Sequence, residues 1–388
     1  MYDILGDIHG YADELELLLA KMGYQRINTV WQHPTRVLIS VGDLIDRGPQ
    51  QKRTVDIMRS MQEYRSAIVI QGNHEFNAIS YATYDANEKP LRAHTPKNKK
   101  QHQQFLNEME NHQDWYKDTI HWFTSLPLLL DLPEFRVVHA CWHSDSIHGL
   151  KTYTDEHFRL LPSAWVHAND PDHPLYHAIE VLMKGWELKL PENYSFTDKD
   201  GHVRDSIRTQ WWLDQNSTYR RIALGVPNTD SLPDCTISSD EMPGYDNQKP
   251  LFIGHYWLKA SPYPTIVSKH VVCVDWSVAD KGALAAYQFD DGDLKPENFV
   301  TVSVRPHDHF SLEQLSEAFY LADPMNTCCV ENDCTDEYEY LAAQVRASLD
   351  DQTALYDAVE QALIDSFDDL VESRHVAKVL IKLGELIH

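Results

Sequence analysis

The sequence predicts an α/β fold: a two-sheet β-sandwich flanked by helices, with a helical appendage at the C-terminal end. Short apolar runs alternate with helical patterns over the first third of the chain, later apolar runs can supply a second sheet, and the last segment carries helical patterns alone. We therefore expect a main domain over residues 1–305 and a helical C-terminal region over residues 306–388.

Four apolar segments in the first part of the chain have the composition of strands. They are Tyr2–Leu5, Arg36–Val41, Ala67–Ile70 and Phe135–Val138. Apolar residues recur at helical spacing over residues 11–22, where we expect a helix, and a second helix is expected over about residues 52–61. Each of the four strands ends directly before polar, chemically reactive residues.

Four later segments have the same strand character, and we expect them to complete a second sheet. They are Leu251–Ile253, Val271–Val274, Ala283–Phe289 and Phe299–Val304. Between the two sets of strands, residues 76–121 predict a helical insertion with a mobile loop, whose basic run at 97–100 we expect to be solvated surface. Residues 145–250 predict long ordered loops with short elements. Beyond Pro306, stripes through Leu355 and Leu380 predict helices.

The composition excludes several classes of protein. Acidic residues outnumber basic ones 59 to 34, and the resulting net charge of -25 opposes binding to a nucleic acid polymer. There is no apolar run long enough to cross a membrane, and the first residues do not resemble a secretion signal, so we expect a cytoplasmic protein. Six cysteines are too few for a disulfide scaffold, and the group Cys328, Cys329 and Cys334 lacks zinc-finger spacing.

Three motifs follow predicted strands: Gly-Asp-Ile-His-Gly at 6–10, Gly-Asp-Leu-Ile-Asp-Arg-Gly at 42–48 and Gly-Asn-His-Glu at 72–75. Any single Asp or Asn here is explained as well by helix capping. Carboxylate, amide and imidazole ligands that recur in this order at strand ends instead indicate a metal site, and the glycines let the backbone turn sharply.

These motifs resemble those of the metallophosphoesterase superfamily, in particular its phosphoprotein-phosphatase-like branch, with its calcineurin-like two-sheet fold. In that branch two later histidines complete the site. His139 follows the strand ending at Val138, and His255 follows the strand ending at Ile253, so both are present here. The resemblance spans about residues 1–305, which would be the catalytic domain.

The resemblance implies two divalent metal ions as cofactors. Asp7, His9 and Asp43 would bind the first ion, and Asp43, Asn73, His139 and His255 the second, with Asp43 shared. A hydroxide bridging the two ions would attack the phosphorus atom, as two-metal sites do. We expect manganese, while iron, zinc, cobalt and nickel fit the same ligand types.

The resemblance also implies which residues handle the phosphate. Arg47 would bind its oxygens, and His74, oriented and charged by Asp46, would protonate the leaving oxygen. A second arginine is expected between the two late histidines, and Arg208 is our choice. The competing arginines are Arg204, Arg220 and Arg221. Asp275 would support a metal-bound histidine.

The substrate is left open by the sequence. We expect a phosphoprotein or phosphomonoester phosphatase, with a symmetric dinucleoside tetraphosphate hydrolase as the alternative. A protein of another class, which holds metals only to stabilise an interaction surface, is the third possibility, and the intact His74 and Arg47 argue against it. The partner would be a phosphorylated substrate or a dinucleoside polyphosphate. The oligomeric state stays open.

Other residues are given a structural interpretation, with a functional alternative. The aromatics expected mainly in the core, but able to stack on a nucleobase, are Trp165, Trp186, Trp211, Trp212, Tyr256 and Trp257. His143 lies close enough in sequence to His139 to contact a substrate. Cys141 and the pair Trp276–Ser277 depart from the family pattern, and we expect them to alter the floor of the cleft.

Overall fold

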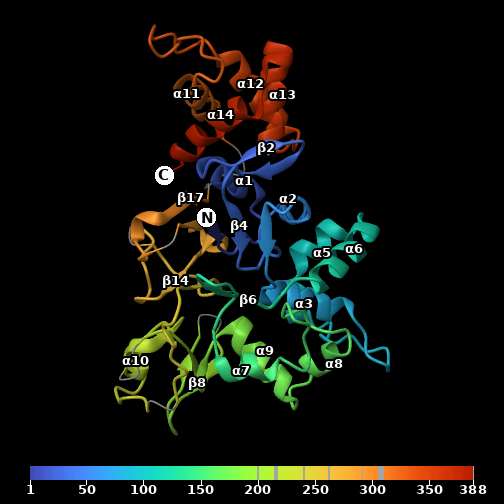
Figure 1. Cartoon of the computed structure of the whole chain (residues 1–388), viewed down its shortest axis with the longest axis vertical. Coiled ribbons are helices and arrows are strands. Elements are labelled where there is room, and N and C mark those ends of the chain that lie inside the picture. The colour runs from blue at the N-terminus through green and yellow to red at the C-terminus, as the bar shows by residue number, and fades with distance from the viewer. Residues whose placement is uncertain are drawn as a thin grey trace.

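The computed structural model describes residues 1–198, 201–213, 217–238, 241–260, 263–290, 292–304 and 310–387. The C-terminal helices lie at one end of an elongated molecule, the two main sheets in the middle, and the segment from α7 Ser144–Gly149 to α10 Tyr219–Ile222 at the other end (Figure 1). The predicted boundary at 305–306 lies outside the described residues. Among the described residues, we find no helix that combines the length and hydropathy needed to cross a bilayer.

The first sheet has the strand order β15-β16-β1-β4-β5, with β17 also paired to β16. Its strands are β1 Tyr2–Leu5, β4 Val37–Ser40, β5 Ala67–Val69, β15 Asp275–Trp276, β16 Ala283–Phe289 and β17 Phe299–Ser303. Strands β1, β4 and β5 are parallel, whereas β16 is antiparallel to β1. The carboxyl ends of β1, β4 and β5 therefore meet at one edge.

The second sheet has the order β14-β13-β7-β6. Its strands are β6 Leu129–Asp131, β7 Arg136–Val138, β13 Leu251–Ile253 and β14 Val271–Cys273. The prediction of two sheets is confirmed, but the assignment of all four late strands to the second sheet is wrong for β16 and β17. Strand β16 instead pairs with β1, with Phe289 opposite Tyr2, and β17 pairs with β16. An apolar strand fits into either sheet as long as other elements cover both of its faces, so its sequence does not show which sheet it joins.

The sandwich interior holds apolar side chains from both sheets. Ile4 and Ile39 of the first sheet meet Val137 and Phe252 of the second in one buried cluster. The alternate residues Leu5 and Leu38 point to the opposite face and join the cluster that the flanking helices cover. The alternation of the two sets fixes the register of β1 against β4.

Helices α1 Ala12–Lys21 and α2 Gln51–Glu63 pack near the first sheet, and a short hairpin of β2 Gln25–Ile27 and β3 Val30–Gln32 lies beside them. Almost all of α1 is buried, including its acidic residues Asp13 and Glu14. The reason is that α14 covers the surface of α1 that the sheet leaves open.

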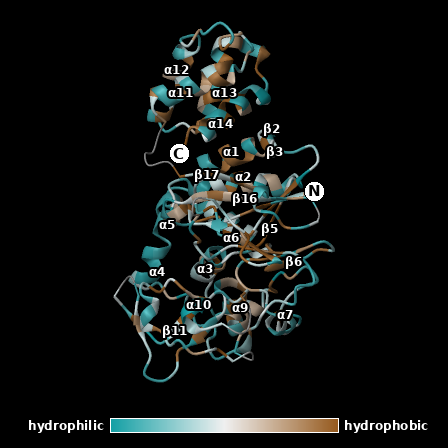
Figure 2. Cartoon of the chain, turned by 90° about the vertical axis from the view of Figure 1, so that its left-hand side faces the viewer, coloured by the Kyte–Doolittle hydropathy of each residue, from teal (hydrophilic) through white to brown (hydrophobic). Residues whose placement is uncertain are grey.

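The predicted helical tail is present. It comprises α11 Leu312–Ala322, α12 Glu339–Asp350, α13 Leu355–Phe367 and α14 Ser373–Glu385. Its apolar residues, Leu380 among them, belong to the same buried cluster as Leu17 of α1. Figure 2 shows apolar residues on α13, α14 and α1, where these helices face each other. The ring of Tyr356 also packs edge-on against Trp31, with the centroids 5.4 Å apart.

Four helices lie between residues 73 and 124, with an irregular segment over residues 83–95: α3 Asn73–Ala82, α4 Pro96–Gln101, α5 Gln103–Met109 and α6 Gln113–Thr124. The following segment contains α7 Ser144–Gly149, α8 Ala164–Ala168, α9 Pro174–Lys184, α10 Tyr219–Ile222, the sheet of β8 Glu187–Lys189, β11 Ser206–Thr209 and β12 Ala223–Leu224, and the ribbon of β9 Phe196–Thr197 and β10 Val203–Arg204. Short 3-10 turns lie at Thr229–Ser231, Val278–Asp280, Pro296–Asn298 and Asp368–Leu370. The elements between residues 145 and 250 are short, as predicted, except for α9. This helix has 11 residues and a buried apolar face, and it was not predicted.

Candidate metal centre and phosphate cleft

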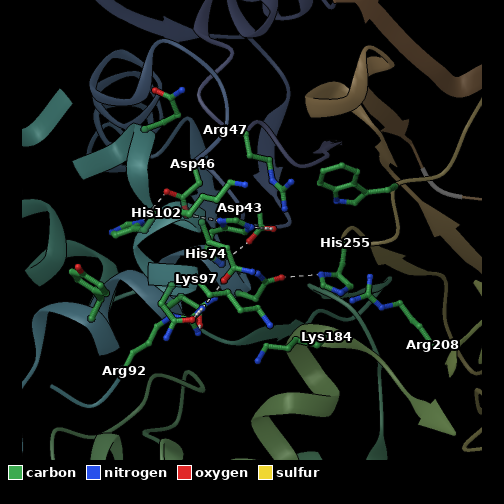
Figure 3. Close-up of a pocket in the computed structure, with 18 residues that line it drawn as sticks. Asp43, Asp46, Arg47, His74, Arg92, Lys97, His102, Lys184, Arg208 and His255 are labelled. Atoms are coloured by element: carbon green, nitrogen blue, oxygen red, sulfur yellow. Dashed lines mark hydrogen bonds and ion pairs between the residues drawn. The ribbon is translucent and has the colours of Figure 1, made fainter. Parts of the chain in front are cut away.

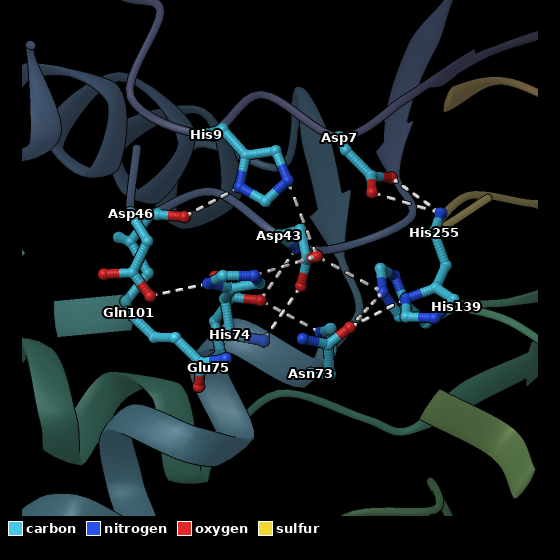
Figure 4. Close-up of polar contacts among 12 residues, drawn as sticks. Asp7, His9, Asp43, Asp46, Asn73, His74, Glu75, Gln101, His139 and His255 are labelled. Carbon is cyan, nitrogen blue, oxygen red and sulfur yellow. Dashed lines mark hydrogen bonds and ion pairs between the residues drawn. The ribbon is translucent and has the colours of Figure 1, made fainter. Parts of the chain in front are cut away.

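The three motifs and the two late histidines converge at the carboxyl ends of strands. Asp7 and His9 follow β1, Asp43 follows β4, and Asn73 and His74 begin α3 after β5. His139 follows β7 and His255 follows β13, so the second sheet supplies both late histidines. Figure 4 shows these side chains pointing toward one another around Asp43.

Asp43 lies at the centre of the cluster. Its Oδ2 atom is 3.4 Å from Nε2 of His139, 3.8 Å from Nε2 of His9 and 3.9 Å from Nε2 of His74. Two groups of side chains bring their ligand atoms within 4.8 Å of one another: His9, Asp43 and His74, and Asp43, His139 and His255. A single carboxylate thus belongs to two neighbouring groups, which is the arrangement that two adjacent metal ions require.

The backbone around this cluster is strained. Non-glycine residues with positive φ include His9 at 51°, Asp43 at 53° and His255 at 72°. Gly42 has a φ of 95°, and a Cβ atom there would lie 2.3 Å from the Gly72 nitrogen. Strain of this kind persists only where surrounding contacts impose it, and it concentrates at functional sites. The motif glycines let two loops approach each other behind the ligands.

The histidine tautomers suit metal binding. The Nδ1 atoms of His9 and His139 lie 2.9 Å and 2.8 Å from the carbonyl oxygens of Ile45 and Val41, so each Nδ1–H donates to the backbone. The Nε2 lone pairs then face the cluster. Nε2 of His9 and Nε2 of His255 are buried with no hydrogen-bond partner, as expected for atoms that bind an ion. These residues fit a pair of divalent cations.

Buried negative charge also fits a cation site. Burial raises the pKa of Asp7, and the neighbouring carboxylates of Asp275 and Asp43 raise it further. The Asp7 carboxylate accepts a hydrogen bond from the backbone N–H of His255, with Oδ2 at 3.1 Å. Carboxylates packed in this way are stable when a cation lies among them.

Asn73 joins the two late histidines. Its Oδ1 atom lies 2.8 Å from Nδ1 of His255 and 3.2 Å from Nε2 of His139. Asp275 acts differently from the expectation: its carboxylate accepts from the backbone N–H groups of Trp257 at 2.7 Å and Ser277 at 3.0 Å. It therefore holds the loop after His255 rather than an imidazole ring.

Glu75, the last residue of the third motif, has a structural role for which no prediction was made. Its carboxylate accepts from the backbone N–H groups of Asp43 and Leu44, both at 2.8 Å, and of Gly72 at 3.0 Å. Burial, together with the charge of Asp43, raises its pKa to about 7. Glu75 thereby ties the loop after β4 to the start of α3.

Asp46 accepts from two histidines. Its Oδ2 atom is 2.6 Å from Nδ1 of His74, and its Oδ1 atom is 2.8 Å from Nδ1 of His102. Burial opposes the ionised form of Asp46, but His102 and His74 lower its pKa overall. Burial likewise opposes a charged His74, while Asp43 and Asp46 raise its pKa overall. His102, at the junction of α4 and α5, was missed because nothing in its local sequence sets it apart among 21 histidines.

Arg47 and Arg208 both line the cleft in front of the cluster. The guanidinium carbon of Arg47 lies 4.1 Å from the ring centroid of Trp257, a cation–π arrangement. Figure 3 shows Arg208 beside His255, whose pKa is lowered by burial and, to a smaller extent, by the charge of Arg208. The competing arginines lie elsewhere: Arg204 pairs with Asp198, Arg220 pairs with Asp234, and Arg221 is exposed.

The cleft has a volume of about 800 Å³ (Figure 3). Besides the site residues, its lining includes Arg92, Lys97, Lys100 and Lys184. The lysines of the basic run at 97–100 are exposed, as expected for solvated surface, but two of them also border the cleft. Lys97 and Lys100 are three residues apart on α4, share a face of that helix and border the cleft, whereas Lys99 does not.

One expectation about the cleft is wrong. Cys141 and Trp276 are buried, and among the described residues neither lines the cleft, so they do not form its floor. His143 caps α7 through Ser146, as its structural interpretation predicts, and it does not line the cleft.

Of the six aromatics considered as base platforms, only Trp257 borders the cleft in the described part of the chain. Trp165, Trp211, Trp212 and Tyr256 are buried, as the core interpretation predicts, and Trp186 donates to the Glu241 carbonyl.

Comparison with known proteins agrees with the site. Residues 2–178 match the family model of calcineurin-like phosphoesterases. The asymmetrical bis(5'-nucleosyl)-tetraphosphatase PrpE of Anoxybacillus flavithermus is 47% identical over 75 residues, 19% of this chain and 31% of that protein. The symmetrical bis(5'-nucleosyl)-tetraphosphatase of Vibrio vulnificus is 33% identical over 138 residues, 35% of this chain and 43% of that protein. The chain thus spans less than half the length of these relatives.

Solved structures resemble the chain at low identity. A putative diadenosine tetraphosphatase is 15% identical with a TM-score of 0.38, covering 79% of this chain and 94% of that one. A protein serine/threonine phosphatase from Saccharomyces cerevisiae is 14% identical with a TM-score of 0.43, covering 80% and 81%. The three motifs and His139 all lie within residues 2–178, the part of the chain that matches this family model. The matched region, residues 2–178, is of the calcineurin-like type, which confirms the resemblance carried by the motifs.

Proposed function

We propose that this chain is a phosphohydrolase that uses two divalent metal ions to cleave phosphate esters or phosphoanhydrides. The observation that carries the proposal is the sharing of Asp43 between the group with His9 and His74 and the group with His139 and His255. Arg47 and Arg208 in the same cleft support it, because a phosphate needs cationic hydrogen-bond donors beside its metal site.

The metal ions would be held by Asp7, His9, Asp43, Asn73, His139 and His255. When bound, they would supply Lewis-acid activation of water and neutralise charge on the phosphoryl group. Manganese is our choice among the metals these ligands accept. We also propose a cytoplasmic location, which the six free cysteines support.

The chain's own residues would do the remaining work. Arg47 and Arg208 bind the non-bridging oxygens and hold the phosphorus in line with the attacking water. As the bond from phosphorus to the leaving oxygen breaks, His74 donates its Nε2 proton to that oxygen. Asp46 accepts from Nδ1 of His74 at 2.6 Å, which keeps the ring oriented and favours its charged form.

The substrate can be a phosphoprotein, a small phosphomonoester or a dinucleoside polyphosphate. The names of the two bis(5'-nucleosyl)-tetraphosphatases support the last of these for the region that aligns with them. A noncatalytic, metal-stabilised interaction protein is the alternative that an activity assay excludes.

The test is turnover of p-nitrophenyl phosphate by the manganese-loaded protein. Asp43→Asn removes the shared carboxylate and should abolish turnover. Asp114→Asn, at an exposed position on α6, is the matched control and should keep wild-type activity. If the wild-type protein turns over neither p-nitrophenyl phosphate nor the phosphoanhydride tripolyphosphate with manganese, iron, zinc, cobalt or nickel, the proposed function is wrong.

A further inference from the structure

We infer that Arg92, Lys97 and Lys100 form a second anion subsite, which binds phosphate groups carried by the leaving group of the substrate. The substrate class this implies is an oligophosphate, in which the departing fragment keeps at least one phosphate. The inference rests on the proposed function, because it names the substrate of that same cleft. It is carried by three observations: an arginine whose hydrogen-bond partners are neutral amides, two lysines that border the cleft, and the place of these cations beside His74.

Arg92 has an unusual set of partners. Its guanidinium donates to Oδ1 of Asn77 at 2.6 Å, to Oε1 of Gln101 at 2.9 Å and to Oδ1 of Asn98 at 3.2 Å. All three acceptors are neutral amides, and within the described ranges no carboxylate lies at ion-pair distance from Arg92. The amides fix the guanidinium in place without an ion pair, and the carboxylates of Asp46 and Glu180 act on its charge only from a greater distance.

Three other arginines of this chain that are partly or largely buried are paired with acids. The pairs are Arg36 with Asp3, Arg53 with Glu16, and Arg136 with Asp246. Burial lowers the pKa of Arg92, which shows that the charge is partly removed from water. Holding a charge there without an acid costs free energy that an anionic ligand recovers.

Lys97 and Lys100 add two charges to the same side of the cleft. Both border it, and in the part of the chain that the structure describes neither has an acidic partner within ion-pair distance. Lys184, which also borders the cleft, differs because it pairs with Glu180. Free lysines concentrated in one cleft of a chain with net charge -25 create a local field that attracts polyanions.

The position of these cations relates them to the leaving group. In Figure 3, Arg92 lies to one side of His74 and Arg208 to the other. Gln101, which accepts from Arg92, directly precedes His102, and His102 bonds Asp46, the partner of His74. The subsite therefore lies beside the residue proposed to protonate the leaving oxygen, while Arg208 lies beside His255.

A single phosphate does not need this surplus charge, because Arg47 and Arg208 already supply two guanidinium groups for it. The departing serine of a phosphoprotein is neutral and gains nothing from three further cations. The departing fragment of a phosphoanhydride chain carries its own negative charge, and the three cations stabilise that charge as it develops.

The experiment compares inorganic tripolyphosphate with p-nitrophenyl phosphate on the manganese-loaded full chain. The variants are Arg92→Gln and the double variant Lys97→Gln with Lys100→Gln. Lys99→Gln, on the same helix but off the cleft, is the matched control. We expect the ratio of kcat/KM for tripolyphosphate to that for p-nitrophenyl phosphate to fall about 10- to 100-fold in each cleft variant and to stay at the wild-type value in the control. Arg92→Lys should recover part of the ratio.

Direct binding separates this inference from the proposed activity. Calorimetric titration of tripolyphosphate into the metal-free protein should show binding that weakens in the cleft variants, weakens with added salt, and is unchanged in Lys99→Gln. If the wild-type protein hydrolyses neither compound but still binds tripolyphosphate in this pattern, the proposed function fails and the subsite stands.

Two results would overturn the subsite. One is an unchanged ratio in both cleft variants, whether neither compound or both compounds equally lose turnover. The other is a loss on a singly phosphorylated serine peptide as large as on tripolyphosphate. A parallel assay on diadenosine tetraphosphate tests whether the substrate carries nucleosides at the ends of its oligophosphate. A higher kcat/KM for diadenosine tetraphosphate than for tripolyphosphate, lost in the same variants, identifies a nucleotide-linked oligophosphate.

Discussion

The Nδ1 atom of His102 lies 2.8 Å from the Oδ1 atom of Asp46. This contact joins two parts of the chain that are far apart in sequence, the loop after β4 and the junction of α4 and α5. Because the other oxygen of Asp46 accepts from His74, the helical segment carrying the cleft lysines is anchored to the proposed general acid.

The first prediction concerns this anchor. His102→Ala should lower kcat for p-nitrophenyl phosphate by about tenfold with a smaller change in KM, because Asp46 loses one of its two fixed donors and orients His74 less well. Steady-state kinetics measure both constants. His102→Asn, whose amide nitrogen can replace Nδ1, should recover part of kcat, and the exposed His121→Asn serves as the control. Equal kinetics for His102→Ala and the wild type would show that the contact is unimportant for catalysis.

The second prediction concerns Trp257, which stacks against Arg47. Trp257→Leu should reduce kcat/KM by about 3- to 30-fold, since the guanidinium loses a cation–π contact of about 0.5–2 kcal/mol and a surface that holds it in place. Trp257→Phe should keep most of the activity. A Leu variant as active as the Phe variant would mean that the ring face does not position Arg47.

The third prediction concerns the metal ions. Manganese should raise the Tm of the metal-free protein, because ligand binding at a hundredfold excess over Kd stabilises the folded state by about 2.7 kcal/mol. Asp43→Asn should remove most of this rise by taking away the ligand common to both groups. Thermal unfolding with and without EDTA measures it. A rise of the same size in the variant would place the bound manganese elsewhere in the protein.

The fourth prediction concerns the attachment of the C-terminal helices. Leu380 of α14 is fully buried in the cluster shared with α1, so Leu380→Ala should lower the free energy of unfolding by about 2–5 kcal/mol. Leu370→Ala is the control, because Leu370 is 66% exposed and should change stability by less than about 0.5 kcal/mol. Urea unfolding followed by tryptophan fluorescence gives both values. A small effect at Leu380 would mean that the tail is only loosely docked.

Much of the fold could be predicted because its signals are local. Strands β1, β13 and β16 occupy the predicted residues, since a short run of β-branched and aromatic residues bounded by turn formers indicates a strand without reference to the rest of the chain. The sheet that β16 joins could not be predicted. Its pairing with β1 depends on contacts between residues 2 and 289, which no local pattern encodes.

By itself the sequence determined the class of site, because ligand type and short spacing decide which metal chemistry is possible. The tertiary structure decided which cations border the cleft: of the four candidate arginines it places Arg208 there, it brings His102 to Asp46, and it puts Lys97 and Lys100 at the cleft border. These relationships depend on how α4, β11 and α9 pack around the cleft, and packing between distant segments is set by the burial of apolar surface across the whole fold.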